Sequence, residues 1–184
     1  PTTFEKADAR EKIYFDPKKT RAAIVTCGKL CPGINDVIRE IVLHLTYRYE
    51  IRAILGIKYG YEGFIAQYNH EVIELTPQIV GEIHEKGGTI LGSSRGPQPT
   101  EDIVDCLERL NVQLLFCIGG DGTLRGANDI YMEIKKRGLK MSVIGVPKTI
   151  DNDIYYIDKS FGFETAFSEA CRAIRAAHVE AKGS

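Results

Sequence analysis

The stretch Val112-Gln-Leu-Leu-Phe-Cys-Ile-Gly-Gly-Asp-Gly-Thr123 decides the fold class of this chain. Residues 112–118 form the most continuous apolar run in the sequence, which is typical of a buried strand in a parallel sheet. Three glycines within four residues follow, and after them a helical pattern extends to about Arg137. A buried strand that passes through a glycine-rich turn into a helix predicts an α/β fold.

The same alternation continues on both sides of this stretch. Short strands separated by helices indicate a three-layer, Rossmann-like α/β fold, with an open, mostly parallel sheet and helices on both faces. Right-handed crossovers would place the strand-to-helix loops at one edge of the sheet, where such folds bind ligands. The predicted strands are 21–27, 51–57, 89–91, 112–118 and 141–146, and the predicted helices are 36–47, Pro77 to the Gly87-Gly88 pair, a helix capped by Thr100, 122–137 and 164–182.

Composition narrows the possible function classes. The 184 residues include 24 Lys+Arg and 25 Asp+Glu, which gives a net charge of -1 and argues against a general nucleic-acid or membrane-surface binder. No apolar run approaches the ~20 residues of a membrane span. The five cysteines are odd in number and scattered, so we expect no disulfide framework and a reducing, cytoplasmic location. Residues 1–19 are predicted to be an extension ahead of the first strand.

The glycine-rich turn has the features of a phosphate site. Its glycines let a ligand approach the backbone, and the free N–H groups at the following helix start favour an anion. Asp121 would repel a phosphate unless a cation lay between them, so we interpret it as an anchor for Mg²⁺. The alternative is an ordinary turn, in which Asp and Gly are common.

A second loop, Pro147-Lys-Thr-Ile-Asp-Asn-Asp153, follows the next predicted strand and should lie beside the first. If the segment is extended, Asp151 and Asp153 project to the same side. One carboxylate could then act as a base on a hydroxyl while the other faces the metal or orders water. Thr149 could donate to a phosphate and Lys148 could neutralise the charge of the group in transfer. The alternative is a polar loop that caps the next helix.

Three further loops carry residues suited to the same chemistry. Gly28 lies in the first strand-to-helix loop, Arg95 follows the short strand at 89–91, and Tyr61 follows the second strand. An aromatic residue there could cover a base or a sugar, or could simply pack. Together the loops predict Mg²⁺-assisted phosphoryl transfer from a nucleotide or polyphosphate to a hydroxyl. No Walker sequence is present, which disfavours the P-loop enzymes.

These motifs resemble the 6-phosphofructokinase family, in which a Gly-Gly-Asp-Gly-Thr loop is combined with Pro-Lys-Thr-Ile-Asp-Asn-Asp. The resemblance covers roughly residues 20–182 and includes further elements in the family's order. They are Cys31-Pro-Gly-Ile-Asn-Asp-Val-Ile-Arg39, Gly60-Tyr-Glu-Gly63, Ser94-Arg-Gly96 and Phe161-Gly-Phe-Glu-Thr-Ala166. The mixture of motifs is similar to that of the plant and kinetoplastid members, which use ATP.

The resemblance implies that residues 20–184 are the N-terminal, phosphoryl-donor-binding lobe of a glycolytic enzyme. That enzyme would transfer a phosphoryl group from Mg²⁺-bound ATP to the 1-hydroxyl of fructose 6-phosphate, as an allosteric cytoplasmic homo-oligomer without nucleic-acid or membrane partners. Asp151 would be the base and Asp121 the Mg²⁺ ligand. Thr149, Asp153, Lys148 and Arg95 would be the further catalytic residues. The sugar phosphate would lie against Thr149, Ile150 and Asp151. The donor would be bound by Gly28, Tyr61, Arg95, Gly120, Asp121, Gly122, Thr123 and Gly126.

Two positions keep alternatives open. Pyrophosphate-dependent members carry Asp where Gly122 stands, which favours ATP here, but Lys148 is the residue seen in pyrophosphate users. Lys29 replaces the family's usual second Gly, where it could crowd the donor or add a charge contact. It therefore favours a second hypothesis, a non-catalytic nucleotide-binding regulatory lobe.

The sugar-phosphate elements that follow in the family are not in this chain, so we expect the chain to be inactive alone.

Overall fold

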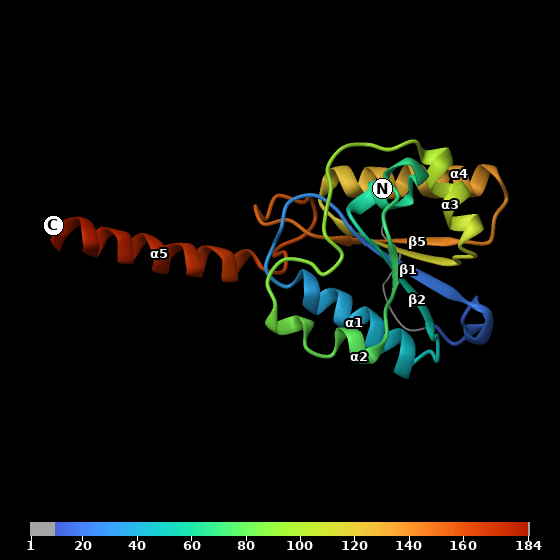
Figure 1. The fold of residues 1–184 in the computed structure, drawn as a ribbon, viewed down its shortest axis with the longest axis horizontal. Coiled ribbons are helices and arrows are strands. Elements are labelled where there is room, and N and C mark those ends of the chain that lie inside the picture. The colour runs from blue at the N-terminus through green and yellow to red at the C-terminus, as the bar shows by residue number, and fades with distance from the viewer. Residues whose placement is uncertain (1–9, 184) are drawn as a thin grey trace.

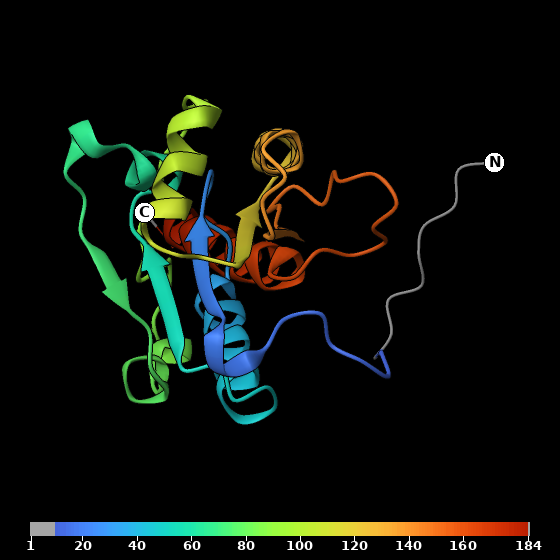
Figure 2. The same ribbon diagram turned by 90° about the vertical axis from the view of Figure 1, so that its right-hand side faces the viewer.

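The computed structural model describes residues 10–183 and confirms the α/β fold class. Its sheet has the strand order β3-β2-β1-β4-β5, and all neighbouring pairs are parallel except β2 with β3. Figure 2 shows this order, from green β3 through β2 and blue β1 to yellow β4. The strands are β1 (Arg21–Thr26), β2 (Ala53–Ile57), β3 (Val72–Glu74), β4 (Leu114–Gly119) and β5 (Ser142–Pro147).

Helices cover both faces of the sheet, as predicted. In Figure 1, α1 and α2 lie below the strands, and α3 and α4 lie above them. The helices are α1 (Ile34–Tyr47), α2 (Pro77–Val80), α3 (Thr100–Arg109), α4 (Asp121–Lys136) and α5 (Phe163–Gly183). Within residues 10–183 there are also four short 3-10 helices, η1 (Pro17–Lys19), η2 (Gly60–Phe64), η3 (Ala66–Tyr68) and η4 (Ile83–Glu85).

The core is divided into two layers by the period-two alternation of the strands. In β1, Ala22 and Ile24 pack with residues of α1, whereas Ala23 and Val25 pack with residues of α3 and α4. All four side chains are fully buried. Because both faces of β1 are covered, its sequence is apolar without alternation, as expected for a central parallel strand. All five cysteines are free, which agrees with the expected absence of a disulfide framework.

The structure corrects several predicted elements. The prediction of a strand at 89–91 is wrong. In the structure, Gly92 N donates to Thr89 O and closes a turn in which Leu91 is buried. The helix from Pro77 is shorter than predicted, since it ends at Val80, and Gly81 and Glu82 separate it from η4. Thr100 is the first residue of α3 and not its N-cap, which is Pro99. The antiparallel strand β3 was not predicted, because three residues are too few to show a pattern.

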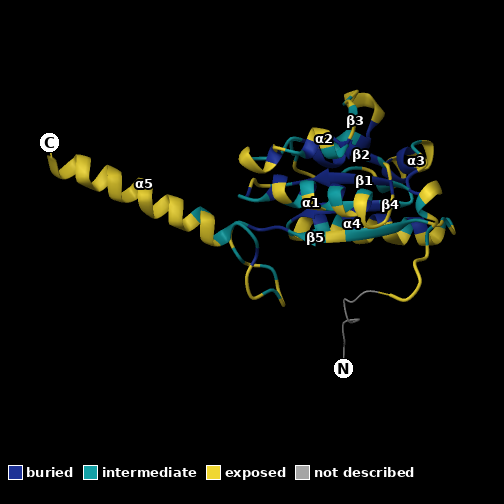
Figure 3. Ribbon diagram, turned by 90° about the horizontal axis from the view of Figure 1, so that it is seen from below, coloured by how far each residue is buried: buried dark blue, intermediate teal, exposed yellow. Residues whose placement is uncertain are grey.

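The last helix, α5, projects away from the sheet, and most of its residues are exposed (Figure 3). No residue of α5 is buried. Within residues 10–183, no helix combines the length and the apolar character needed to cross a membrane. The predicted extension at 1–19 lies partly outside the described residues; residues 10–19 hold only the short turn η1 ahead of β1.

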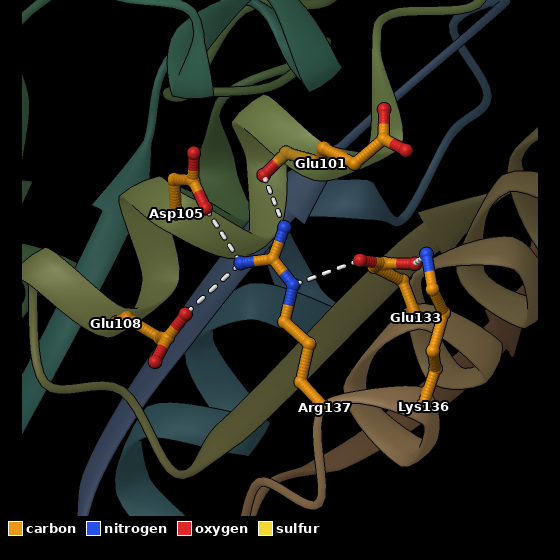
Figure 4. A network of polar contacts seen from close by, with 6 residues as sticks. All are labelled: Glu101, Asp105, Glu108, Glu133, Lys136 and Arg137. Carbon is orange, nitrogen blue, oxygen red and sulfur yellow. Dashed lines mark hydrogen bonds and ion pairs between the residues drawn. The ribbon is translucent and has the colours of Figure 1, made fainter.

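Arg137 joins the end of α4 to α3 through a network of polar contacts (Figure 4). Its guanidinium donates to Asp105 at 2.5 Å, to Glu108 at 3.0 Å and to Glu133 at 2.8 Å, and more weakly to the carbonyl of Glu101 at 3.4 Å. The hydrogen bond from Arg137 to Glu133, with one from Lys136, holds the pKa of Glu133 below its ordinary value of 4.5. One cation thus fixes the relative position of the two helices on this face.

We expect Arg137→Gln to lower the free energy of unfolding at pH 7 but to have much less effect at pH 3. The pKa of Glu133 is lower in the folded than in the unfolded state, so its ionised form stabilises the fold above about 4.5. That stabilisation is lost as the pH falls through the lower, folded-state pKa. Urea unfolding of both proteins at the two pH values measures the effect. An equal difference at both values would contradict the ionic origin of this contact.

Candidate functional site

A cavity of about 620 Å³ opens at the carboxyl ends of the parallel strands. It is lined by the loops after β1, β4 and β5, by η2, and by the segment ahead of α3. This volume lies in the range of about 300–1,000 Å³ that is usual for small-molecule sites. All the predicted site residues line it, namely Gly28, Tyr61, Arg95, Gly120, Asp121, Gly122, Thr123, Gly126, Lys148, Thr149, Ile150, Asp151 and Asp153.

The glycines at the start of α4 have different structural roles. A β-carbon on Gly119 would overlap the Thr123 side chain, so this position requires the smallest residue. Gly120 is the N-cap of α4, and a β-carbon there would lie 3.4 Å from the Lys148 carbonyl. Gly122 has nothing within 4 Å of its β-carbon position. Gly119 therefore permits close packing, whereas Gly122 leaves the cavity open beside the amides of the helix start.

Tyr61 packs beneath α4. The residue is only 6% exposed, and its hydroxyl donates to the Thr123 carbonyl at 2.8 Å. A β-carbon on Gly126 would meet this ring at 2.7 Å, so the glycine allows η2 and α4 to approach each other. Burial raises the pKa of the Tyr61 hydroxyl. The ring packs against α4 and also forms part of the cavity wall, and its contact with a nucleotide stays a prediction.

Lys148 lies at the end of β5 and is only 3% exposed. Its ammonium donates to the main-chain carbonyl of Lys29 and so joins the loops that follow β5 and β1. Burial lowers the pKa of Lys148, and the nearby cations Arg95 and Lys29 lower it further, against the influence of the thiols of Cys31 and Cys27. A buried ammonium at this place provides a fixed positive charge in the wall of the cavity.

The loop from 149 to 160 is closed by its own side chains. Thr149 Oγ1 donates to Asp153 at 2.5 Å and accepts from the Asp151 amide at 3.1 Å. Ser160 donates to the Thr149 carbonyl at 2.6 Å through its hydroxyl, and to Asn152 Oδ1 at 2.7 Å through its amide. The expectation of an extended segment is wrong at Asn152, whose φ of 53° lies in the left-handed region that Asn tolerates. Asp151 and Asp153 nonetheless line the same cavity.

The two carboxylates of this loop have different partners. Asp153 accepts the Thr149 hydroxyl, whereas Asp151 forms an ion pair with Lys29 at 2.9 Å. The Lys29 and Asp151 side chains are 59% and 51% exposed. Asp151 is thus the more accessible candidate for contact with a ligand. The Lys29 side chain lies across the cavity wall towards it.

The donor set is compatible with Mg²⁺. Among residues 10–183, no group of three or more His, Cys, Asp or Glu side chains lies close enough to hold a metal ion. Mg²⁺ is usually held by one or two carboxylates together with substrate phosphates, so a full protein cage is not required. Asp121 is the first residue of α4 and lines the cavity beside the glycine amides. It could share a cation with a bound phosphate.

Sequence reasoning missed several residues of the cavity wall. Arg125 and Asp129 lie four and eight positions after Asp121, so they share its face of α4, and this spacing was a usable signal. Ile103 and Ile130 supply an apolar wall from α3 and α4. No local pattern distinguishes such wall residues from other core residues, and only the packing of the two helices identifies them.

Comparison with known proteins adds an independent observation. Residues 21–184 match the family described as Phosphofructokinase. The chain is 53% identical over 181 residues to "ATP-dependent 6-phosphofructokinase 7" of Arabidopsis thaliana, with 98% of this chain and 37% of the relative covered. It is 50% identical to the "ATP-dependent 6-phosphofructokinase" of Trypanosoma cruzi, with the same coverage. The predicted resemblance to plant and kinetoplastid members is confirmed, and the chain spans less than half the length of these relatives.

The solved structures agree on the fold. The crystal structure of Pichia pastoris phosphofructokinase in the T-state aligns with a TM-score of 0.74 at 21% identity, covering 96% of this chain and 21% of the other. At this identity the likeness concerns the fold alone.

Proposed function

Because the chain belongs to the phosphofructokinase family, we propose that it is the donor-binding lobe of an ATP-dependent 6-phosphofructokinase and carries the catalytic base. The observation that supports this most is that one cavity is lined both by the glycine-rich start of α4 and by Asp151. The first is suited to phosphates and the second to a hydroxyl. The reaction is the transfer of the terminal phosphoryl group of ATP to the 1-hydroxyl of fructose 6-phosphate.

Each part of the cavity has a distinct role in this proposal. Asp151 accepts the proton of the 1-hydroxyl while the oxygen forms its bond to the γ-phosphorus and the bond to the β-phosphate oxygen breaks. The amides of Gly120 and Gly122 and the forked donors of Arg95 hold the phosphates. Lys148 stabilises negative charge on the group in transfer. Mg²⁺, held by Asp121 and the donor, would offset the charge of the phosphates.

Gly122 supports ATP as the donor over pyrophosphate. Its β-carbon position faces open space, so the inner phosphates and the nucleoside of ATP meet no side chain there. The relatives described above carry names that specify ATP dependence. The homo-oligomeric state and the cytoplasmic location stay predictions, and so does the inactivity of the chain alone.

We expect Gly122→Asp to reduce kcat/KM for ATP by at least about tenfold, because a second carboxylate would face the inner phosphates. Gly122→Asn is the matched control, since it has the same size without the charge. A coupled assay of fructose 6-phosphate phosphorylation on the whole gene product, with ATP and then pyrophosphate as donor, measures both. Turnover with pyrophosphate alone in the unaltered protein would overturn the donor assignment, and no turnover with either donor would overturn the proposed function.

A further inference from the structure

The ion pair between Lys29 and Asp151 joins two loops that are 122 residues apart in the chain. Lys29 follows β1 and Asp151 follows β5, and both line the cavity. The bond of 2.9 Å places an ammonium directly on the carboxylate that the proposed function uses as its base. A hydroxyl that approaches this oxygen must therefore compete with Lys29.

The strength of this contact decides what it can do. Both side chains are more than half exposed, so the pair is screened by water and contributes little to stability. A pair of this kind is readily exchanged for another partner of the same charge. It is therefore poorly suited to holding the fold together and well suited to being displaced by an anionic ligand.

The main chain of Lys29 is held in place although its side chain is exposed. The buried ammonium of Lys148 donates to the Lys29 carbonyl, and the amide of neighbouring Gly28 donates to the Ser94 carbonyl at 3.0 Å. The Ser93 hydroxyl also donates to the Gly28 carbonyl at 2.7 Å. Because its backbone is anchored, the Lys29 ammonium can reach only a limited region at the mouth of the cavity.

The charges around the cavity point to a use for such an ammonium. Within the described part of the chain, four cationic and four acidic side chains line it, so the wall is formally neutral. A polyphosphate adds several negative charges to that wall, and the buried Lys148 ammonium already donates one of its three hydrogens to a carbonyl, so a second cation could share the added charge. Lys29 is a cation whose present partner is Oδ2 of Asp151, and moving it to the donor would free that oxygen for the acceptor hydroxyl.

We propose that Lys29 is an exchangeable cation that pairs with Asp151 when the cavity is empty and moves to the phosphates of the donor when ATP binds. The exchange supplies a charge contact to the donor and uncovers the Asp151 carboxylate for the acceptor hydroxyl. This inference rests on the proposed function for the identity of the base. It makes Lys29 a donor-binding residue. Asp151 would then contact the Lys29 ammonium before ATP binds and the acceptor hydroxyl afterwards.

The test is a double-mutant cycle on the affinity for Mg²⁺-ATP, measured by calorimetric titration of the whole gene product without fructose 6-phosphate. We expect Lys29→Met to weaken binding about tenfold, because a charge-assisted contact to phosphate is lost. Lys29→Arg, the matched control that keeps the charge, should bind within about twofold of the unaltered protein. Circular dichroism should show the same thermal midpoint for all three, as expected for an exposed side chain.

The second arm of the cycle separates exchange from simple repulsion. Asp151→Asn should tighten binding up to about fivefold when Lys29 is present, since the competing ion pair is gone. In the Lys29→Met background the same change should have an effect of less than about twofold. Equal effects in both backgrounds, or unchanged affinity on Lys29→Met, would overturn the inference. If the effects of Lys29 and Asp151 on ATP affinity are coupled but the protein does not phosphorylate fructose 6-phosphate, the inference stands and the proposed function is rejected. If the protein turns over but the two effects are not coupled, the proposed function stands and the inference is rejected.

Discussion

Replacing Asp151 with Asn in the whole gene product is expected to reduce kcat for fructose 6-phosphate phosphorylation by about 10²–10⁴-fold, the usual contribution of a general base. Asn has almost the same shape but cannot accept the hydroxyl proton. Because Asp151 is exposed and its side chain contacts Lys29 and not the core, the substitution should leave the fold intact. Binding of Mg²⁺-ATP should persist or tighten, because the ion pair with Lys29 is lost, so the loss should appear in kcat and the donor KM should not rise.

Asp153→Asn is the matched comparison, since it removes an equal charge from the same loop. Asp153 accepts the Thr149 hydroxyl at 2.5 Å, and an amide oxygen could still accept that hydrogen bond. We expect it to reduce kcat far less than Asp151→Asn. Rate measurements under saturating substrates distinguish the two carboxylates. If Asp151→Asn retained most of its turnover while Asp153→Asn lost it, the base would be Asp153.

The convergence of the loops was predictable because it follows from topology and not from side-chain detail. Once the apolar runs around 21–27, 112–118 and 141–146 are recognised as parallel strands, right-handed crossovers bring their following loops to one edge. The order β1-β4-β5 then places the Gly120–Thr123 turn beside the loop at 148–153. The predicted site residues in these loops follow from this topology, whereas Gly126 and Ile150 were named only from the family resemblance, and the chemical roles of all of them stay predictions.

What the sequence could not show lies in contacts between distant segments. The turn at 89–91 was mistaken for a strand because Leu91 is buried, and burial in a turn gives the same apolar signal as burial in a strand. The left-handed φ of Asn152 depends on its side chain holding Ser160, eight positions away. Lys29 and Asp151 are 122 positions apart in the sequence, so no local pattern could predict their ion pair.

Gly119→Ala is expected to destabilise the fold by about 1–3 kcal/mol, the typical cost of inserting a methyl group into a packed interior. The new methyl would overlap the Oγ1, Cγ2 and Cβ atoms of Thr123. A rotation about the Thr123 side chain could move the first two atoms but not the Cβ, so the start of α4 itself must shift. Because the Gly119 carbonyl accepts from the Lys148 amide at 2.9 Å, that shift would also disturb the loop after β5.

Gly122→Ala, three residues later in the same motif, is expected to have the opposite sign. Its β-carbon position has nothing within 4 Å, and it lies in the first turn of α4. Ala in place of Gly inside a helix stabilises by about 0.5–1 kcal/mol, because the unfolded chain loses less freedom on folding. The free energy of unfolding, measured with urea, should therefore be lower for Gly119→Ala and higher for Gly122→Ala than for the unaltered protein. If both were destabilised, both glycines would be required by packing, and Gly122 could not be the open position through which a donor's inner phosphates approach the helix amides.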